Sequence, residues 1–132
     1  TTPPIRFVEW WAESDGPTTA TPIRVELIRH TGGAQTTLTA YAAADIAKVN
    51  DPNAPASSIQ LGTALSGFIN TTTEVTPTGA VSLETHFVPP TSGIYVQFPL
   101  GREPEVQVSA FARIRTTAGA NVNCYAGLMW EE

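Results

Sequence analysis

Short runs of alternating apolar and polar residues recur along the chain, and turns rich in glycine or proline separate them. A period of two places successive side chains on opposite faces of extended backbone, so each run predicts a β-strand. The runs recur about every ten residues, which favours a β-sandwich or jelly roll of about eight or nine short antiparallel strands. The predicted strands cover residues 5–13, 22–30, 36–41, 58–62, 65–75, 80–88, 94–100, 105–116 and 121–131.

The segments between these runs predict the organisation of the chain. Its 132 residues form a single domain, 1–132, which is long enough to bury a core. Residues 1–6 contain Pro3 and Pro4 and are expected to form an extended N-terminal arm. Residues 42–58 are expected to form one long loop with a short helix in its first half. Residues 36–41 are expected to return as the hairpin partner of residues 22–30.

The alternation also predicts which side chains fill the core between two sheets. Cys124 is in phase with its apolar neighbours, so we expect a buried, inert thiol, since reactive thiols need exposure and cationic surroundings. The expected core residues are Ile23, Val25 and Leu27; Val81, Leu83, Thr85 and Phe87; Ile94, Val96, Phe98 and Leu100; Val106, Val108, Ala110, Ala112 and Ile114; and Val122, Cys124, Ala126, Leu128 and Trp130.

Several large apolar side chains fall out of phase with this core, namely Tyr95, Phe111, Tyr125 and Met129. If the last two predicted strands pair, these residues form an apolar patch on the opposite face. Two explanations stay open: the patch is a subunit interface, or the long loop covers it.

The adjacent residues Trp10 and Trp11 must point to opposite faces of a strand. One is therefore expected in the core and the other toward solvent or a partner. We interpret the tryptophans, including Trp130, as residues of the core or of a protein interface. The alternative is a platform on which sugar rings stack.

Composition excludes several classes of partner. The net charge of −5 and the scarcity of lysine argue against binding to nucleic acid and to anionic membranes. A single cysteine forms no internal disulfide. The N-terminal residues resemble no signal peptide, and Thr1 is what removal of an initiator methionine would leave.

No motif indicates catalysis, a cofactor or a metal site. His30 and His86 are far apart and lie at predicted outward positions, where surface histidines are common. The sequence "DPNAP" at 51–55 lacks the later ligands of a calcium loop, although dispersed loops of sandwich proteins can also bind calcium. Outward glutamates could supply the two catalytic carboxylates of a glycosidase. Such residues are, however, normal on the solvent-exposed face of an antiparallel sheet. We expect a protein that is not an enzyme.

Three segments, "TTPPIR", "VPPTSGIYVQFPLG" and "ANVNCYAGLMWEE", together with the Thr/Ala-rich short strands, resemble the small decoration, or cement, proteins of tailed-bacteriophage heads. The resemblance implies a β-sandwich or jelly roll, often trimeric, that sits on the capsid near threefold positions. It implies binding to the major capsid protein and reinforcement of the shell against internal DNA pressure. The expected location is the capsid surface of a virion, after synthesis in the host cytoplasm.

Contacts with the capsid or between subunits are expected from the arm, the long loop and the out-of-phase side chains. Alternatives are a carbohydrate-binding or host-recognition module that uses Trp11 or Tyr125, and a TNF-like or C1q-like trimeric ligand. The predicted interface residues are Thr1, Thr2, Pro3, Pro4, Ile5, Arg6, Trp11, Asn50, Asp51, Pro52, Tyr95, Phe111, Tyr125 and Met129.

Overall fold

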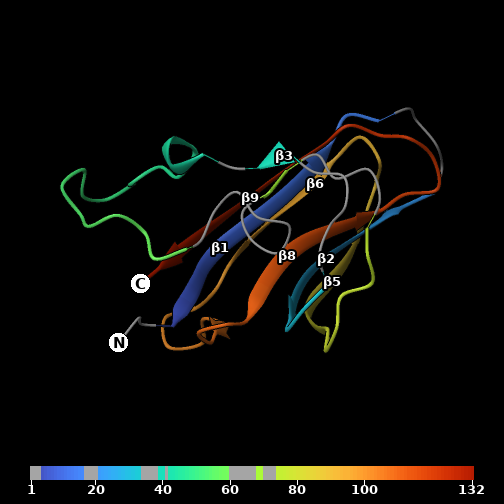
Figure 1. Cartoon of the computed structure of the whole chain (residues 1–132). Helices are drawn as coiled ribbons and strands as arrows, with labels where there is room; N and C mark the ends of the chain where they lie inside the picture. The colour runs from blue at the N-terminus through green and yellow to red at the C-terminus, as the bar shows by residue number, and fades with distance from the viewer. Residues whose placement is uncertain (1–3, 17–20, 34–38, 41, 60–67, 70–73) are drawn as a thin grey trace.

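A computed structural model describes residues 4–16, 21–33, 39–40, 42–59, 68–69 and 74–132 (Figure 1). Within these residues the protein is all-β apart from one short 3₁₀ turn, which confirms the predicted class. The elements are β1 (Ile5–Ser14), β2 (Ile23–His30), β3 (Thr39–Ala40), η1 (Ala43–Asp45), β4 (Phe68–Ile69), β5 (Val81–Val88), β6 (Gly93–Gln97), β7 (Glu105–Val106), β8 (Phe111–Thr117) and β9 (Cys124–Glu131).

Two antiparallel sheets form the body of the protein. In the first sheet, β9 runs along one side of β1, while β6 and β7 follow one another along the other side. In the second sheet, β2 lies between β5 and β8. The strands β3 and β4 form a separate pair. Figure 1 shows β9 and β6 on either side of β1.

The core lies between the two sheets. Its fully buried side chains come from the central strands β1 and β2 and from β7, so the middle of each sheet supplies most of the apolar contact. These residues are Phe7, Trp10, Ala12, Ile23, Val25, Leu27 and Val106.

A β-bulge in β1 explains how residues of different phase reach this core. Phe7 pairs with Trp130 and Glu9 pairs with Met129, so Val8 is an extra residue on β1. The bulge changes the phase of the strand, and both Phe7 and Trp10 therefore point inward. Trp10 is completely buried and Trp11 lies on the opposite face, as the sequence predicted.

A second bulge makes part of the predicted core wrong. Leu27 pairs with Glu84 and Ile28 pairs with Ser82, which leaves Leu83 without a partner on β2. Beyond this bulge the phase of β5 reverses. Glu84 and His86 face the core, whereas Thr85 and Phe87 face outward, and Phe87 is 71% exposed.

The predicted strand over residues 105–116 is in fact two strands in different sheets. β7 ends at Val106 in the first sheet, and β8 begins at Phe111 in the second. Between them Ser109 has a φ of 67°, and the amide of Ala110 donates to the carbonyl of Gln107 over 3.0 Å. Val108 lies in this crossing and is exposed, so its assignment to the core was wrong.

Four further residues of the predicted core are exposed because they lie at or near the ends of strands, and one of them is Ala126 on the edge strand β9. Leu100 lies in a turn beyond β6 and is 95% exposed. Val81 begins β5 and is also largely exposed. Cys124 has the predicted phase, but it pairs with Ser14 at the end of β1, past the core, and is exposed.

The pairing of β2 contradicts the predicted hairpin. Both sides of β2 are occupied by β5 and β8, and β3 pairs with β4 instead. Residues 34–38 and most of the predicted strands 58–62 and 65–75 lie outside the described residues. Ile5 and Arg6, expected in the N-terminal arm, belong to β1.

In the long loop, Ala43–Asp45 form the three-residue 3₁₀ turn η1. In η1 the carboxylate of Asp45 accepts a 2.6 Å hydrogen bond from the amide of Ala42. The loop then returns to the end of the chain, where the amide of Ser58 donates to Glu132 over 2.8 Å. Burial favours the neutral acid of Glu132, but hydrogen bonds from Ser57, Ser58 and Trp130 hold its pKa below the ordinary value.

Candidate interaction surface

The outer face of the first sheet gathers four of the predicted interface side chains. Trp11 on β1 pairs with Tyr95 on β6 and with Gly127 on β9. Directly opposed residues share a face of the sheet, as do residues two positions apart along a strand. The aromatic face, as we name it, therefore consists of Glu9, Trp11, Glu13, Tyr95, Tyr125 and Met129.

Gly127 creates the space that Trp11 occupies. A Cβ atom at this position would lie 1.9 Å from Cζ2 and 2.5 Å from Cη2 of Trp11. The indole ring therefore lies directly across the backbone of β9. Tyr125 and Met129, two residues to either side of Gly127, flank the position over which the ring lies.

The two tyrosines of the aromatic face are open to solvent. Tyr95 and Tyr125 are each 61% exposed, while Trp11 and Met129 are half-buried. The long loop thus leaves both tyrosines uncovered. An exposed cluster of this kind is typical of interaction surfaces, because aromatic side chains offer a large, rigid contact area.

Carboxylates border Trp11 on both sides along β1. Glu9 pairs with Met129 and Glu13 pairs with Tyr125 across the strand. The phenol of Tyr95 donates to the carboxylate of Glu9. This hydrogen bond is the main reason why the pKa of Tyr95 is raised above its ordinary value, with desolvation and the Glu9 charge acting in the same direction.

The other predicted interface residues do not join this face. The last two strands do not pair with each other, because β8 pairs with β2 and β9 pairs with β1. Phe111 consequently lies on the second sheet, stacked on His30 with 5.4 Å between ring centroids. Residues Asn50, Asp51 and Pro52 form an exposed turn in the long loop. There the carboxylate of Asp51 accepts a hydrogen bond from the amide of Asn53. Thr1, Thr2 and Pro3 lie outside the described residues, and Pro4 is half-buried just before β1.

A polar network that the sequence did not predict lies on the outer face of the second sheet. Arg115 donates from Nε to Glu26 over 2.9 Å, and Arg24 approaches the same oxygen at 3.3 Å. Arg113 donates to Nε2 of His30 over 3.1 Å and also pairs with Glu74 at 3.3 Å.

His30 points outward, as predicted, but it is only 2% exposed, so its interpretation as a surface histidine was wrong. Its Nδ1 lies 3.0 Å from the carbonyl of Gly32, and its Nε2 accepts from Arg113. These two contacts together require the neutral tautomer that carries its proton on Nδ1. Burial lowers the pKa of His30, the charge of Arg113 lowers it further, and the Gly32 hydrogen bond and Glu74 oppose them.

The pKa values of the two arginines Arg113 and Arg115 are shifted in opposite directions. Burial lowers the pKa of Arg113, although Glu74 partly offsets the effect. The hydrogen bond to Glu26 raises the pKa of Arg115 despite some burial. Both side chains are occupied by partners within the protein, so the network fixes the second sheet internally.

The second histidine, His86, points toward the inner side of the second sheet and is partly exposed at its edge. Trp10 donates from Nε1 to the carboxylate of Glu84 over 3.1 Å, and its ring lies 6.0 Å from that of His86. His86 also approaches Glu84 at 3.4 Å. The prediction that His86 points outward was therefore wrong, because the bulge at Leu83 changes its phase.

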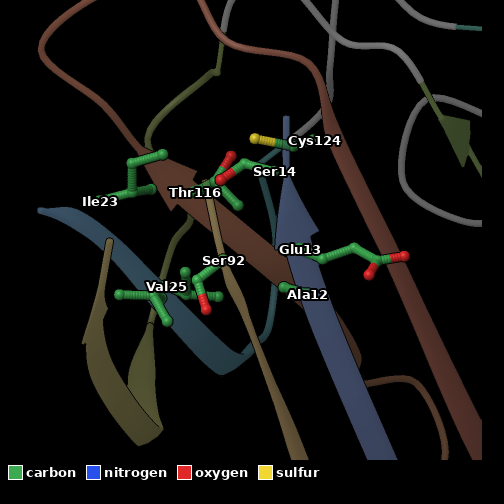
Figure 2. A pocket seen from close by; sticks show the side chains of 9 residues that line it. Ala12, Glu13, Ser14, Ile23, Val25, Ser92, Thr116 and Cys124 are labelled. Carbon is green, nitrogen blue, oxygen red and sulfur yellow. The ribbon is translucent and has the colours of Figure 1, made fainter. Parts of the chain in front are cut away.

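A small cavity opens at the end of the sandwich, where β1, β2, β8 and β9 meet (Figure 2). Its volume of about 10 Å³ is roughly what one water molecule requires. Its lining residues include Ser14, Ser92, Thr116 and Cys124, and most of the lining surface is apolar. Figure 2 shows that the Glu13 side chain points away from the other lining residues, in agreement with its place on the aromatic face.

Within the described ranges, no group of three or more His, Cys, Asp or Glu side chains is placed to hold a metal ion. In the same part of the chain, no helix has the length and apolar character needed to cross a membrane. Comparison with protein-family models, with curated proteins and with solved structures gave no match to this chain.

Proposed function

We propose that the protein is a non-enzymatic structural component of a bacteriophage head, which decorates the capsid and stabilises it by binding the lattice of the major capsid protein. The observation that carries this proposal is the convergence of Trp11, Tyr95, Tyr125 and Met129 on one exposed sheet face. Tryptophan, tyrosine and methionine are enriched at protein interfaces. The resemblance of the sequence to head decoration proteins supplies the identity of the partner.

The proposal includes a homotrimer on the capsid surface of the virion. A trimer that contacts several lattice positions gains avidity, so each copy needs only a modest affinity. The proposal also includes a jelly-roll topology for the β-sandwich. Light scattering across a concentration series tests the assembly: a stable mass near three times 14.0 kDa supports the trimer. A monomer at every concentration contradicts a trimer in solution.

Co-sedimentation with heads tests the function. Undecorated heads of tailed bacteriophages are mixed with the protein, pelleted, and analysed for bound protein. The wild-type protein is expected to pellet with heads of its cognate phage, and Trp11→Ala is expected to reduce binding at least tenfold. Phe87→Ala is the matched control, because Phe87 is an exposed aromatic residue on the second sheet. Equal loss in both variants would contradict the role of the aromatic face.

One observation favours a second candidate, a carbohydrate-binding or host-recognition module. The Trp11 indole lies over Gly127, and the carboxylates of Glu9 and Glu13 flank it along β1, where they could accept hydrogen bonds from sugar hydroxyls. This function predicts retention of the protein on a glycan panel and loss of retention in Trp11→Ala or Tyr125→Ala with the fold intact. Absence of retention by the wild-type protein on a broad panel would remove this candidate.

A further inference from the structure

The aromatic face differs from an ordinary apolar patch in its charge. The four strands of the first sheet carry a single basic residue, Arg6, and it already pairs with Glu105 at 3.6 Å. Four glutamates belong to the same strands: Glu9, Glu13, Glu105 and Glu131. The surface around Trp11 is thus aromatic and acidic at the same time.

The two glutamates nearest to Trp11 have no cationic partner among the described residues. Glu9 accepts a hydrogen bond from the Tyr95 phenol, which orients its carboxylate and leaves its charge uncompensated. Glu13 is exposed and points over β9 (Figure 2). The rise of a β-strand places each of them about 7 Å from Trp11 along β1.

We propose that the aromatic face binds a basic segment of a partner protein, with an arginine side chain stacked on the Trp11 indole and paired with Glu9 or Glu13. This inference rests on the proposed function, since it takes the aromatic face as the docking surface and names the chemistry of its partner. A guanidinium is planar, stacks on an indole and binds carboxylates through two parallel hydrogen bonds. Lysine, a compact and strongly hydrated charge, fits this arrangement less well.

Charge complementarity selects this occupant over a second copy of the chain. A symmetric pairing of two aromatic faces would bring Glu9 and Glu13 of one copy against the same residues of the other. Like charges opposed in an interface are costly, whereas a basic partner neutralises them. The same negative charge repels phosphate groups.

Fluorescence anisotropy with labelled peptides tests the inference without any capsid. Three decapeptides are titrated with the protein at low salt, with Arg-Gly, Lys-Gly and Glu-Gly repeats. We expect the arginine peptide to bind at least tenfold more tightly than the glutamate peptide and severalfold more tightly than the lysine peptide. Binding should weaken as salt is added, because the carboxylate contacts are partly exposed.

Variants then locate the site. The double variant Glu9→Gln/Glu13→Gln and the variant Trp11→Ala are each expected to weaken arginine-peptide binding about tenfold. Glu103→Gln removes one carboxylate outside the four strands and is expected to retain binding. Circular dichroism confirms that each variant is folded. Absence of peptide binding, or binding that these variants leave unchanged, overturns the inference.

Two further outcomes separate this inference from the proposed function. Capsid binding that persists in Glu9→Gln/Glu13→Gln, without any affinity for the arginine peptide, contradicts only the basic partner. Arginine-peptide binding without capsid binding supports the basic partner and contradicts the proposed function. Glycan retention or self-association through the aromatic face would assign the surface to a different occupant and overturn the inference.

Discussion

The Nε–H group of Arg113 donates to Nε2 of His30 across 3.1 Å, between two strands more than eighty residues apart in sequence. The imidazole must be neutral to accept this hydrogen bond, since imidazolium carries a proton on both nitrogens. Protonation of His30 would remove an acceptor and place a second cation beside Arg113. The pairing therefore makes stability depend on pH.

The pKa of His30 is lowered in the fold, so between the folded and unfolded pKa values the unfolded chain binds the extra proton. The free energy of unfolding should accordingly be greatest above about pH 6.5 and should fall as pH drops from there toward the folded pKa. Urea denaturation at pH 8, 7, 6 and 5.5 measures this slope. His30→Asn should flatten the slope, because it removes the titrating group. An unchanged slope in His30→Asn would show that other groups carry the pH dependence.

Substitution of the two adjacent tryptophans should have opposite consequences. Trp10 is completely buried, so Trp10→Ala is expected to lower the free energy of unfolding by about 3–5 kcal/mol. Trp11 faces outward, and Trp11→Ala should cost about 1 kcal/mol of stability while weakening partner binding at least tenfold. Chemical denaturation of both variants checks the difference. Equal destabilisation would contradict their placement on opposite faces.

Gly127→Ala should displace the Trp11 indole, because the new Cβ would lie 1.9 Å from Cζ2 of the ring. Gly119→Ala is the control, since its nearest neighbour, Cγ2 of Thr21, would be 4.0 Å away. We expect Gly127→Ala to change the near-ultraviolet circular dichroism of tryptophan and to weaken arginine-peptide binding about tenfold. If its spectrum and binding match those of Gly119→Ala, the ring does not depend on Gly127 for its position.

Deletion of residues 1–4 tests the arm, because β1 begins at Ile5 and stays intact. Restricted prolines in this segment would lower the entropy cost of docking on a neighbour. The truncated protein should keep its thermal unfolding midpoint and lose at least tenfold in affinity for heads. Undiminished co-sedimentation of the truncated protein would exclude the arm from capsid binding.

The sequence predicted the strands well where alternation was uninterrupted. Leu128 and Trp130 pack against the core, as their phase in β9 predicted. Single extra residues at Val8 and Leu83 change the phase, and alternation alone does not show where such a bulge occurs. The errors at Phe87 and His86 both follow from the bulge at Leu83.

The site was predictable only in part, for a similar reason. Phase identified Tyr95, Tyr125 and Met129 as outward residues, and the structure places them beside Trp11. Which strands pair depends on contacts across the whole chain, so Phe111 was wrongly grouped with them. The burial of His30 likewise depends on the pairing of β2 with β8, which no local pattern encodes.

The most direct test of the central claim is electron cryomicroscopy of cognate phage heads incubated with the protein. The account predicts ordered density for the protein on the capsid surface near threefold positions, with Trp11, Tyr95 and Tyr125 turned toward the major capsid protein. It also predicts a basic side chain of the capsid over the Trp11 ring. Bound protein whose aromatic face is turned toward solvent, or heads that carry no added density, would contradict it.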